Sequence, residues 1–528
     1  MITHYRFRLF LVTLLMHGSS LWLRAQHVQT YSATITQDDL KKYLTYIASD
    51  ELEGRDTGSK GIRLAADYIV KHFKEWGLTG PVANHAENHF LQPVPLQTTR
   101  LETTLSVKGK NLEAFQHYIA INNNIQTGKA KTEIVFAGYG IDDEAYSDFR
   151  NTPLNVKNKA VVILNDEPRN AAGKYLLSGT DKPSEKWNLN TRVELLRSKG
   201  AKYVLIAIPN ETFARYASMM KANAERGSIS LTGGTPRSSR IAGDMIVPLS
   251  GVASLLGTNQ QALENQLKAA QNQSIAGTMK SKLKVNIRKV QTPMVCYNVL
   301  GFIEGTDKKD EVIVLSAHYD HVGIQNGQIM NGADDDGSGV VAVMEMAQAF
   351  AQAKAEGKAP RRSILFLLVT AEEKGLLGSQ YYADQNPIFP LTNTVANLNI
   401  DMIGRMDERY PNNPNYVYVI GSDRLSTDLH KIGEEIGKTY FPDLKLDYTY
   451  NDPNDPNRFY FRSDHYNFAK HGIPSIFYFN GTHQDYHQPT DDVEKIHFGK
   501  LEKITRYIFT TAWEIANRDE RLTVDKKQ

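Results

Sequence analysis

Runs of apolar residues alternate with amphipathic stretches over the second half of the chain. The apolar runs predict strands near residues 295–303, 312–316, 363–369, 394–401, 416–420 and 474–479. Helical spacing of apolar positions follows near residues 338–353, 376–385, 425–438, 464–471 and 498–516. Continuous apolar strands separated by helices are typical of a parallel sheet that is covered on both faces. We therefore predict an α/β fold with a mostly parallel mixed sheet and helices on both of its faces.

The first half of the chain has a different pattern of apolar and polar residues. Residues 36–78 show the helical period, and the turn-rich stretch 49–59 within them is either a solvated connection or part of the rim of a site. Strand patterns dominate from about residue 99, and the polar stretch 211–240 is predicted to be a long loop. Residues from about 100 to 285 contain no set of side chains suited to catalysis. This stretch is predicted to be an inserted β-rich α+β domain.

The N-terminal residues have the pattern of a secretory leader. Arg6 and Arg8 precede an apolar run from Leu9 to Met16, and Ala25 is a small residue suited to cleavage. The run is too short to span a bilayer, and no other stretch looks transmembrane. We expect residues 1–25 to be a signal peptide and the mature protein to be exported, either to a periplasm or outside the cell. The expected domains are N-terminal helices of a main domain at 26–100, the insertion at 101–285, the rest of the main domain at 286–518 and a polar tail at 519–528.

Composition supports a globular protein with more than one domain. A chain of 528 residues exceeds what one hydrophobic core usually supports, and 41% hydrophobic and 23% charged residues are ordinary proportions. The net charge falls from +2 to −1 without the three arginines of the leader, so nothing indicates a nucleic-acid or anionic-membrane partner. Cys296 is the only cysteine, which excludes an intramolecular disulfide, and its strand-like context predicts a buried, inert thiol.

Side chains that bind metals follow three successive predicted strands. They are His318 and Asp320 after the first strand, Asp334, Asp335 and Asp336 in the Gly-rich loop that follows, Glu372 and Glu373 after the second strand, and Asp401 at the end of the third. Open α/β sheets build sites outside the carboxyl ends of their strands. An imidazole with several carboxylates and no thiolate suits a hard or borderline divalent cation such as zinc or manganese. The pattern predicts a hydrolase site with two metal ions.

The residue types also indicate which residues can bind metal and which can transfer a proton. One aspartate of the triplet, at the start of a helix, can bridge two cations, and the helix dipole favours its negative charge. One member of the pair Glu372 and Glu373 can bind metal while the other takes a proton from water. The carboxylate of Asp320 can accept the second N–H of the His318 imidazole. A last imidazole ligand is expected after the strand at 474–479, where spacing alone does not choose between His483 and His487.

The acidic loop has one rival interpretation. Asp334, Asp336, Ser338 and Glu345 fall at spacings of an EF-hand calcium loop. That motif requires a helix before its first ligand, whereas residues 322–333 contain three glycines and no helical period. The two-metal interpretation is therefore preferred.

Taken together, these motifs resemble the co-catalytic zinc aminopeptidase family, which also contains glutamate carboxypeptidase, glutaminyl cyclases and the non-catalytic transferrin receptor. The similarity covers residues 36–90 and 290–518 and rests on five ordered motifs. The resemblance implies two zinc ions per chain, with ligands His318 and Asp401 on one, Glu373 and His487 on the other, and Asp335 bridging both. It implies Glu372 as general base, Tyr486 as stabiliser of the oxyanion, and Asp320, Asp336 and Asp491 as residues that support the ligands. A cis peptide between Asp335 and Asp336 is also implied, and the insertion looks like a protease-associated domain.

The function implied by this resemblance is removal of N-terminal residues from peptides. The alternatives are a single-zinc acyltransferase of the glutaminyl cyclase type, a carboxypeptidase of the same family and a binding protein without catalysis. The aspartate at 335 and the Ser338-Gly339 context favour two metals over the cyclase. No ligand position of the pattern is substituted, which disfavours a non-catalytic protein.

Overall fold

The computed structural model describes residues 28–83, 88–121, 125–150, 154–234, 243–270 and 273–526. The predicted leader, residues 1–25, lies outside them. The chain forms two compact units: unit 1 comprises the residues up to Pro95 and from Val295 onward, and unit 2 comprises Leu96–Met294. The sequence prediction put the insertion at 101–285. Among the described residues, no helix combines the length and hydropathy that a membrane span requires.

A mixed sheet forms the centre of unit 1. Its strand order is β16-β15-β17-β14-β10-β13-β9. Pairing is parallel for β10 with β13 and β14, for β14 with β17 and for β15 with β16, and antiparallel for β13 with β9 and for β15 with β17. The bounds are β10 Lys308–His318, β13 Arg362–Val369, β14 Thr394–Ile400, β15 Tyr416–Ile420, β16 Lys445–Asp447, β17 Ser475–Phe479 and, shared with unit 2, β9 Gly277–Ile303. The predicted fold class, a mostly parallel mixed sheet flanked by helices, is confirmed.

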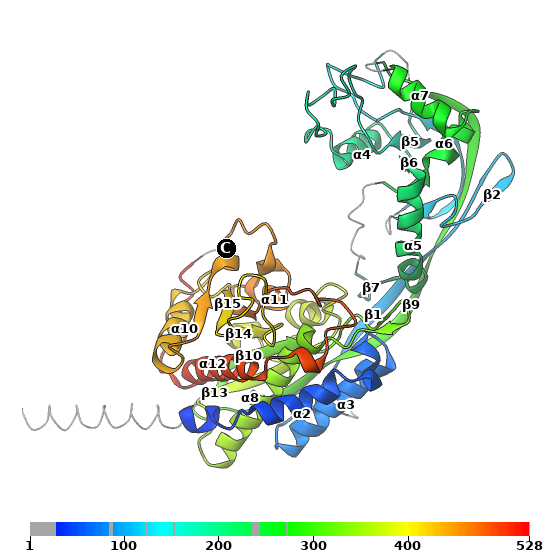
Figure 1. The fold of residues 1–528 in the computed structure, drawn as a ribbon. Helices are drawn as coiled ribbons and strands as arrows, with labels where there is room; N and C mark the ends of the chain where they lie inside the picture. Colours follow the sequence, from blue (N-terminus) through cyan, green and yellow to red (C-terminus); the bar gives the residue numbers. More distant parts are fainter. Residues whose placement is uncertain are drawn as a thin grey trace, which may run out of the picture. The chain divides into compact units, whose positions relative to one another are not determined.

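Helices cover both faces of this sheet because side chains along each strand alternate between them (Figure 1). Ile313 and Leu315 of β10 point into one core, together with α2 Gln37–Ile47, α3 Lys60–Glu75, α8 Gly339–Ala355, α10 Thr427–Tyr440 and α12 Phe498–Asn517. Val312 and Val314 point into the opposite core, beside Tyr382 and the short helix α11 His465–Ala469. The short helix α9 Leu377–Gln380 precedes Tyr382. Both faces are therefore buried, as continuous apolar strands require.

Local signals set the helix ends. The side chain of Thr36 accepts a hydrogen bond from the N–H of Asp39 at the start of α2, and Ser59 does the same for Ile62 at the start of α3. The hairpin of β11 Ile324–Gln325 and β12 Gln328–Ile329 precedes the acidic loop, and α8 begins directly after it. The described residues before the loop thus contain no helix of the EF-hand type.

Unit 2 contains a parallel set of strands, β4 Gly128–Phe136, β5 Ala160–Leu164, β6 Tyr203–Ile208 and β8 Met245–Pro248. Its helices are α4 Leu189–Ser198, α5 Asn210–Arg226, α6 Leu249–Leu255 and α7 Gln260–Ala270 (Figure 1). The remaining strands are β1 Leu91–Val107, β2 Lys110–Leu112, β3 Ile119–Ala120 and β7 Ser228–Leu231, and β4 also pairs antiparallel with the first part of β9.

The prediction of a loop over residues 211–240 is wrong for most of that stretch. Residues 210–226 form α5, and residues 228–231 form β7. Phe213 and Ala217, four positions apart, pack into the core of unit 2, and Tyr216 and Met220 pack partly buried beside them. The prediction treated residues 211–240 as one stretch, whereas the glycines lie at 227, 233 and 234 and the residues before them are good helix formers.

Cys296 is buried, as predicted. Burial raises the pKa of its thiol to about 11, so the thiolate is disfavoured.

Candidate metal centre

The carboxyl ends of four parallel strands meet at one edge of the unit 1 sheet. His318 is the last residue of β10, Glu372 and Glu373 follow β13, Asp401 follows β14, and the loop after β17 carries Tyr486 and His487. The acidic loop between β10 and α8 adds Asp335. The strand register therefore brings together side chains that lie up to 169 positions apart in the sequence.

One group of potential ligands consists of His318, Asp335 and Asp401, all buried. Nε2 of His318 lies 3.3 Å from Oδ1 of Asp335 and 3.6 Å from Oδ1 of Asp401. The other carboxylate oxygen of Asp401 accepts a hydrogen bond from the hydroxyl of Ser463 at 2.7 Å, which leaves Oδ1 directed at the group.

A second group consists of His321, Asp335, Glu373 and His487. Nε2 of His487 lies 3.0 Å from Oδ2 of Asp335 and 3.1 Å from Oε1 of Glu373. Asp335 thus offers one oxygen to each group, as a bridging carboxylate would. Although burial opposes it, the neighbouring His321, His318 and His487 hold the pKa of Asp335 well below its usual range.

Glu372 belongs to neither group. Its Oε2 lies 3.9 Å from Nε2 of His318, and its side chain is 12% exposed. Its backbone N–H donates to the carboxylate of Asp320. Burial, together with Glu373, Asp464 and Asp401, raises the pKa of Glu372 well above its usual range, despite the opposing effect of His318. The Glu372 side chain therefore lies beside the two groups of potential ligands, and its carboxylate belongs to neither of them.

Asp336 and Asp491 hold the backbone of the acidic loop. The carboxylate of Asp336 accepts hydrogen bonds from the N–H groups of His318, Gly339 and Met402. Asp491 accepts from the N–H groups of Asp334 and Asp335. The peptide between Asp335 and Asp336 is cis, as the resemblance implies.

Asp320 lies next to His318, but its carboxylate is not the atom nearest the imidazole. Nδ1 of His318 lies 3.0 Å from the backbone carbonyl oxygen of Asp320 and 4.0 Å from its carboxylate. That carboxylate accepts hydrogen bonds from the hydroxyl of Thr57 and from the N–H of Glu372 instead. Asp320 therefore links Thr57, in the loop before α3, to the end of the His318 strand and to the turn that carries Glu372.

The loop after β17 carries His483 and His487, and the structure shows which of these two histidines lies among the potential ligands. His487 lies in the second group, whereas Nε2 of His483 contacts Asp334 at 3.1 Å. The ring of Tyr486 stacks on that of His487, with centroids 4.0 Å apart. Tyr486 also lines a small cavity of about 30 Å³, together with Phe459, Phe477, Phe479 and the potential ligands His318, Asp335, Glu373 and Asp401.

Two residues of this region are not predicted from the sequence: His321 and Arg55. His321 comes three positions after His318 and joins the second group; the imidazole was visible in the sequence, but nothing in the pattern gave its direction. Arg55 is fully buried and donates to the carbonyl oxygens of Ile47, Tyr319, Asn331 and Gly332. The turn-rich loop 49–59 thus helps to support the site through Arg55. The burial of a single arginine produces no periodic pattern in the sequence, so it could not be predicted.

A comparison with known families gives a match at residues 298–512, to peptidase family M28. This match covers 215 of the 528 residues, and residues 298–512 are called the M28 segment. This M28 segment contains every predicted ligand from His318 to His487.

Some of the curated relatives of this chain carry aminopeptidase names, and others are named as probable glutamate carboxypeptidases. Aminopeptidase YwaD of Bacillus subtilis is 27% identical over 255 residues, which are 46% of this chain and 49% of that protein. The probable leucine aminopeptidase 2 of Aspergillus oryzae is 31% identical over 212 residues, 39% of this chain and 37% of that protein. The chain thus spans half or less of the length of these curated relatives. The solved aminopeptidase from Aneurinibacillus sp. strain AM-1 shares the fold, with a TM-score of 0.53, 17% identity and coverage of 95% of this chain and 98% of that one.

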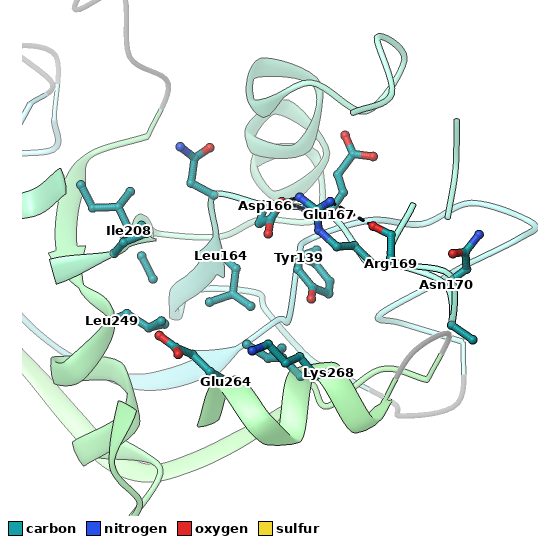
Figure 2. A pocket seen from close by; sticks show the side chains of 16 residues that line it. Tyr139, Leu164, Asp166, Glu167, Arg169, Asn170, Ile208, Leu249, Glu264 and Lys268 are labelled. Carbon is teal, nitrogen blue, oxygen red and sulfur yellow. Dashed lines mark hydrogen bonds and ion pairs between the residues drawn. The ribbon is translucent and has the colours of Figure 1, made fainter. Parts of the chain in front are cut away.

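Outside the M28 segment, unit 2 has a larger pocket of about 610 Å³ at the ends of β5 and β6 (Figure 2). Charged side chains of both signs line it: Asp166, Glu167, Arg169, Glu264 and Lys268. Among the described residues, both groups of potential metal ligands lie in the M28 segment and neither in this pocket. The cluster in unit 1 is therefore the candidate functional site.

Proposed function

We propose that this protein is an exported aminopeptidase that uses two zinc ions and a water molecule to remove N-terminal residues from peptides. The observation that carries the proposal is the pair of ligand groups that share Asp335, with Glu372 beside them. Similarity to proteins named aminopeptidases supports the reaction and the peptide substrate. The predicted leader, residues 1–25, supports export.

The donor atoms suit zinc. Imidazole nitrogens and carboxylate oxygens are ligands that zinc accepts, and the described residues provide no thiolate at the cluster. Oδ2 of Asp335, Oε1 of Glu373 and Nε2 of His487 are buried and have no hydrogen-bond partner among the described residues. Buried polar atoms are normally satisfied, so converging unsatisfied acceptors fit a shared cation.

When bound, two zinc ions would lower the pKa of a water molecule and polarise the scissile carbonyl. His318 and Asp401 would hold one ion, Glu373 and His487 the other, and Asp335 both. Glu372 takes the proton of the attacking water through its carboxylate and delivers it to the nitrogen of the leaving amine. The hydroxyl of Tyr486 donates a hydrogen bond to the developing oxyanion. Asp320, Asp336 and Asp491 keep the ligand-bearing turns in place.

The remaining expectations belong to the same proposal. Unit 2 includes the predicted insertion at 101–285, which we assign to the protease-associated type. Substrates are peptides with a free N-terminus, and no nucleic acid takes part.

The test compares wild type with Glu372→Gln on aminoacyl and peptide substrates with free and with blocked N-termini, and measures zinc in both proteins. We expect hydrolysis of the free substrates alone, two zinc ions per chain in both proteins, and a loss of turnover of about 10²–10⁴-fold in the variant. Glu408→Gln, which changes an exposed carboxylate of the same unit, should retain full activity. Loss of zinc together with activity would make Glu372 a ligand and overturn its assignment.

Other results point to the alternatives. One zinc per chain with cyclisation of N-terminal glutamine peptides would identify a glutaminyl cyclase. Release of C-terminal residues would identify a carboxypeptidase. A folded chain that binds no zinc would be a binding protein.

A further inference from the structure

His321 lies beside the second group of ligands without being part of the motif that predicts it. Its side chain is 0% exposed, and Nδ1 lies 3.0 Å from Oε1 of Glu373 and 3.7 Å from Oδ2 of Asp335. Its ring meets that of His487 edge-on, with centroids 5.5 Å apart. The imidazole therefore points into the space that Glu373 and His487 share.

The contact between His321 and Glu373 is not aligned as a hydrogen bond. Both ring nitrogens of His321 and Oε1 of Glu373 lack a hydrogen-bond partner among the described residues. The same holds for Oδ2 of Asp335 and Nε2 of His487. These four side chains place ligand atoms within 4.8 Å of one another. Four buried acceptor atoms around one point are an arrangement suited to direct coordination of a cation.

The surrounding backbone fixes the direction of His321. Gly332 has a left-handed φ of +58°, and a Cβ atom there would lie 2.5 Å from Cδ2 of the His321 ring. The N–H of His321 donates to the carbonyl oxygen of Arg55 at 3.2 Å. Gly332 therefore packs against one side of the His321 ring, and the hydrogen bond to Arg55 holds the His321 backbone. The ring nitrogen that would bind a cation is preorganised as a result.

We propose that His321 is a direct ligand of the cation held by Glu373 and His487, so that this site has four protein ligands and the His318 site has three. The inference rests on the proposed two-zinc function. A site closed by four protein ligands is typical of tightly held zinc, whereas three protein ligands leave a position open for water or substrate. The two sites therefore differ in affinity: the His321 site fills first and releases its ion last, and the His318 site exchanges more readily.

The first experiment titrates the metal-free full-length protein with Zn²⁺ against a chromogenic chelator. Wild type should bind two ions in separate steps. His321→Ala should weaken the tighter step by at least about 100-fold, the upper end of the effect of removing a residue that only supports a ligand, and should leave the other step within about threefold. His483→Ala removes another buried imidazole near the loop and should change neither step by more than about threefold. Equal binding by wild type and His321→Ala overturns the inference.

The second experiment distinguishes coordination from mere support of Glu373. His321→Cys, loaded with Co²⁺, should show the near-ultraviolet charge-transfer absorption of a thiolate bound to cobalt. Wild type contains the buried Cys296 and should show no such band, which makes it the matched control. Co²⁺ binding by the cysteine variant without the band refutes direct coordination. Failure of wild type to bind Zn²⁺ at all would refute the proposed function, whereas two steps unaffected by His321→Ala would refute only this inference.

Discussion

Glu345 provides a test of the packing of unit 1 that does not involve the metal cluster. It lies in α8, is 2% exposed, and one of its carboxylate oxygens has no hydrogen-bond partner among the described residues. The other oxygen accepts from the N–H of Thr36 at 3.3 Å. Burial and the nearby Asp39 raise the pKa of Glu345 to about 8, against the smaller opposing effects of Thr36 and Lys42.

The sign of the resulting pH dependence follows from proton linkage. Between the unfolded pKa of 4.5 and the folded pKa of about 8, the folded protein holds a proton that the unfolded chain has lost. The stability that Glu345 contributes is therefore complete below pH 4.5 and falls as the pH rises to about 8. At about 1.4 kcal/mol per pH unit, the loss amounts to roughly 4 kcal/mol between about pH 5 and pH 8.

Glu345→Gln keeps the shape and the acceptor for Thr36 but cannot ionise. We expect the free energy of unfolding of this variant, minus that of wild type, to grow by roughly 4 kcal/mol from about pH 5 to pH 8. Urea unfolding at a series of pH values measures it, and the other titrating groups cancel in the difference. Glu435→Gln makes the same change at an exposed position of α10 and should leave the difference nearly flat. Parallel pH profiles for wild type and Glu345→Gln would refute the reasoning.

Two further predictions concern the site. Tyr486→Phe keeps the ring that stacks on His487, so kcat should fall by about 10²–10³-fold with KM within about threefold; a change in KM alone, in steady-state kinetics, would contradict a role in the transition state. In Gly332→Ala the new Cβ would lie 2.2 Å from the carbonyl oxygen of Asp335, so denaturant unfolding should show a loss of about 3 kcal/mol or more. Gly357→Ala has a similar φ of +74° with open space around it and should lose only about 1–2 kcal/mol; equal losses at both glycines would contradict the close packing around Gly332.

The strands of unit 1 and most of its helices could be predicted because their patterns are strong. Val312 and Ile313 belong to an unbroken apolar run, and such runs are buried whichever face each residue takes. The polar residues directly after these runs then had to lie at one edge of a parallel sheet. Glu373 and Asp401 lie beside His318 because β13 and β14 both pair parallel with β10.

Loops and narrow helices could not be predicted in the same way. The direction of His321 depends on the turn after β10 and on Gly332, which no periodicity records. The carbonyl rather than the carboxylate of Asp320 faces His318 because that carboxylate is occupied by Thr57, a residue 263 positions away. Residues 210–226 form a helix because they contain four alanines and other good helix formers, and Phe213 and Ala217 pack into the core. The glycines and most of the serines that suggested a loop lie in residues 227–240.

The central claim is that Asp335 stands between two cations. Anomalous diffraction at the zinc absorption edge, from crystals of the zinc-loaded protein, tests it most directly. The account predicts two peaks, one beside His318 and Asp401 and one beside Glu373 and His487, with a carboxylate oxygen of Asp335 directed at each. A single peak, or peaks at other residues, would contradict it.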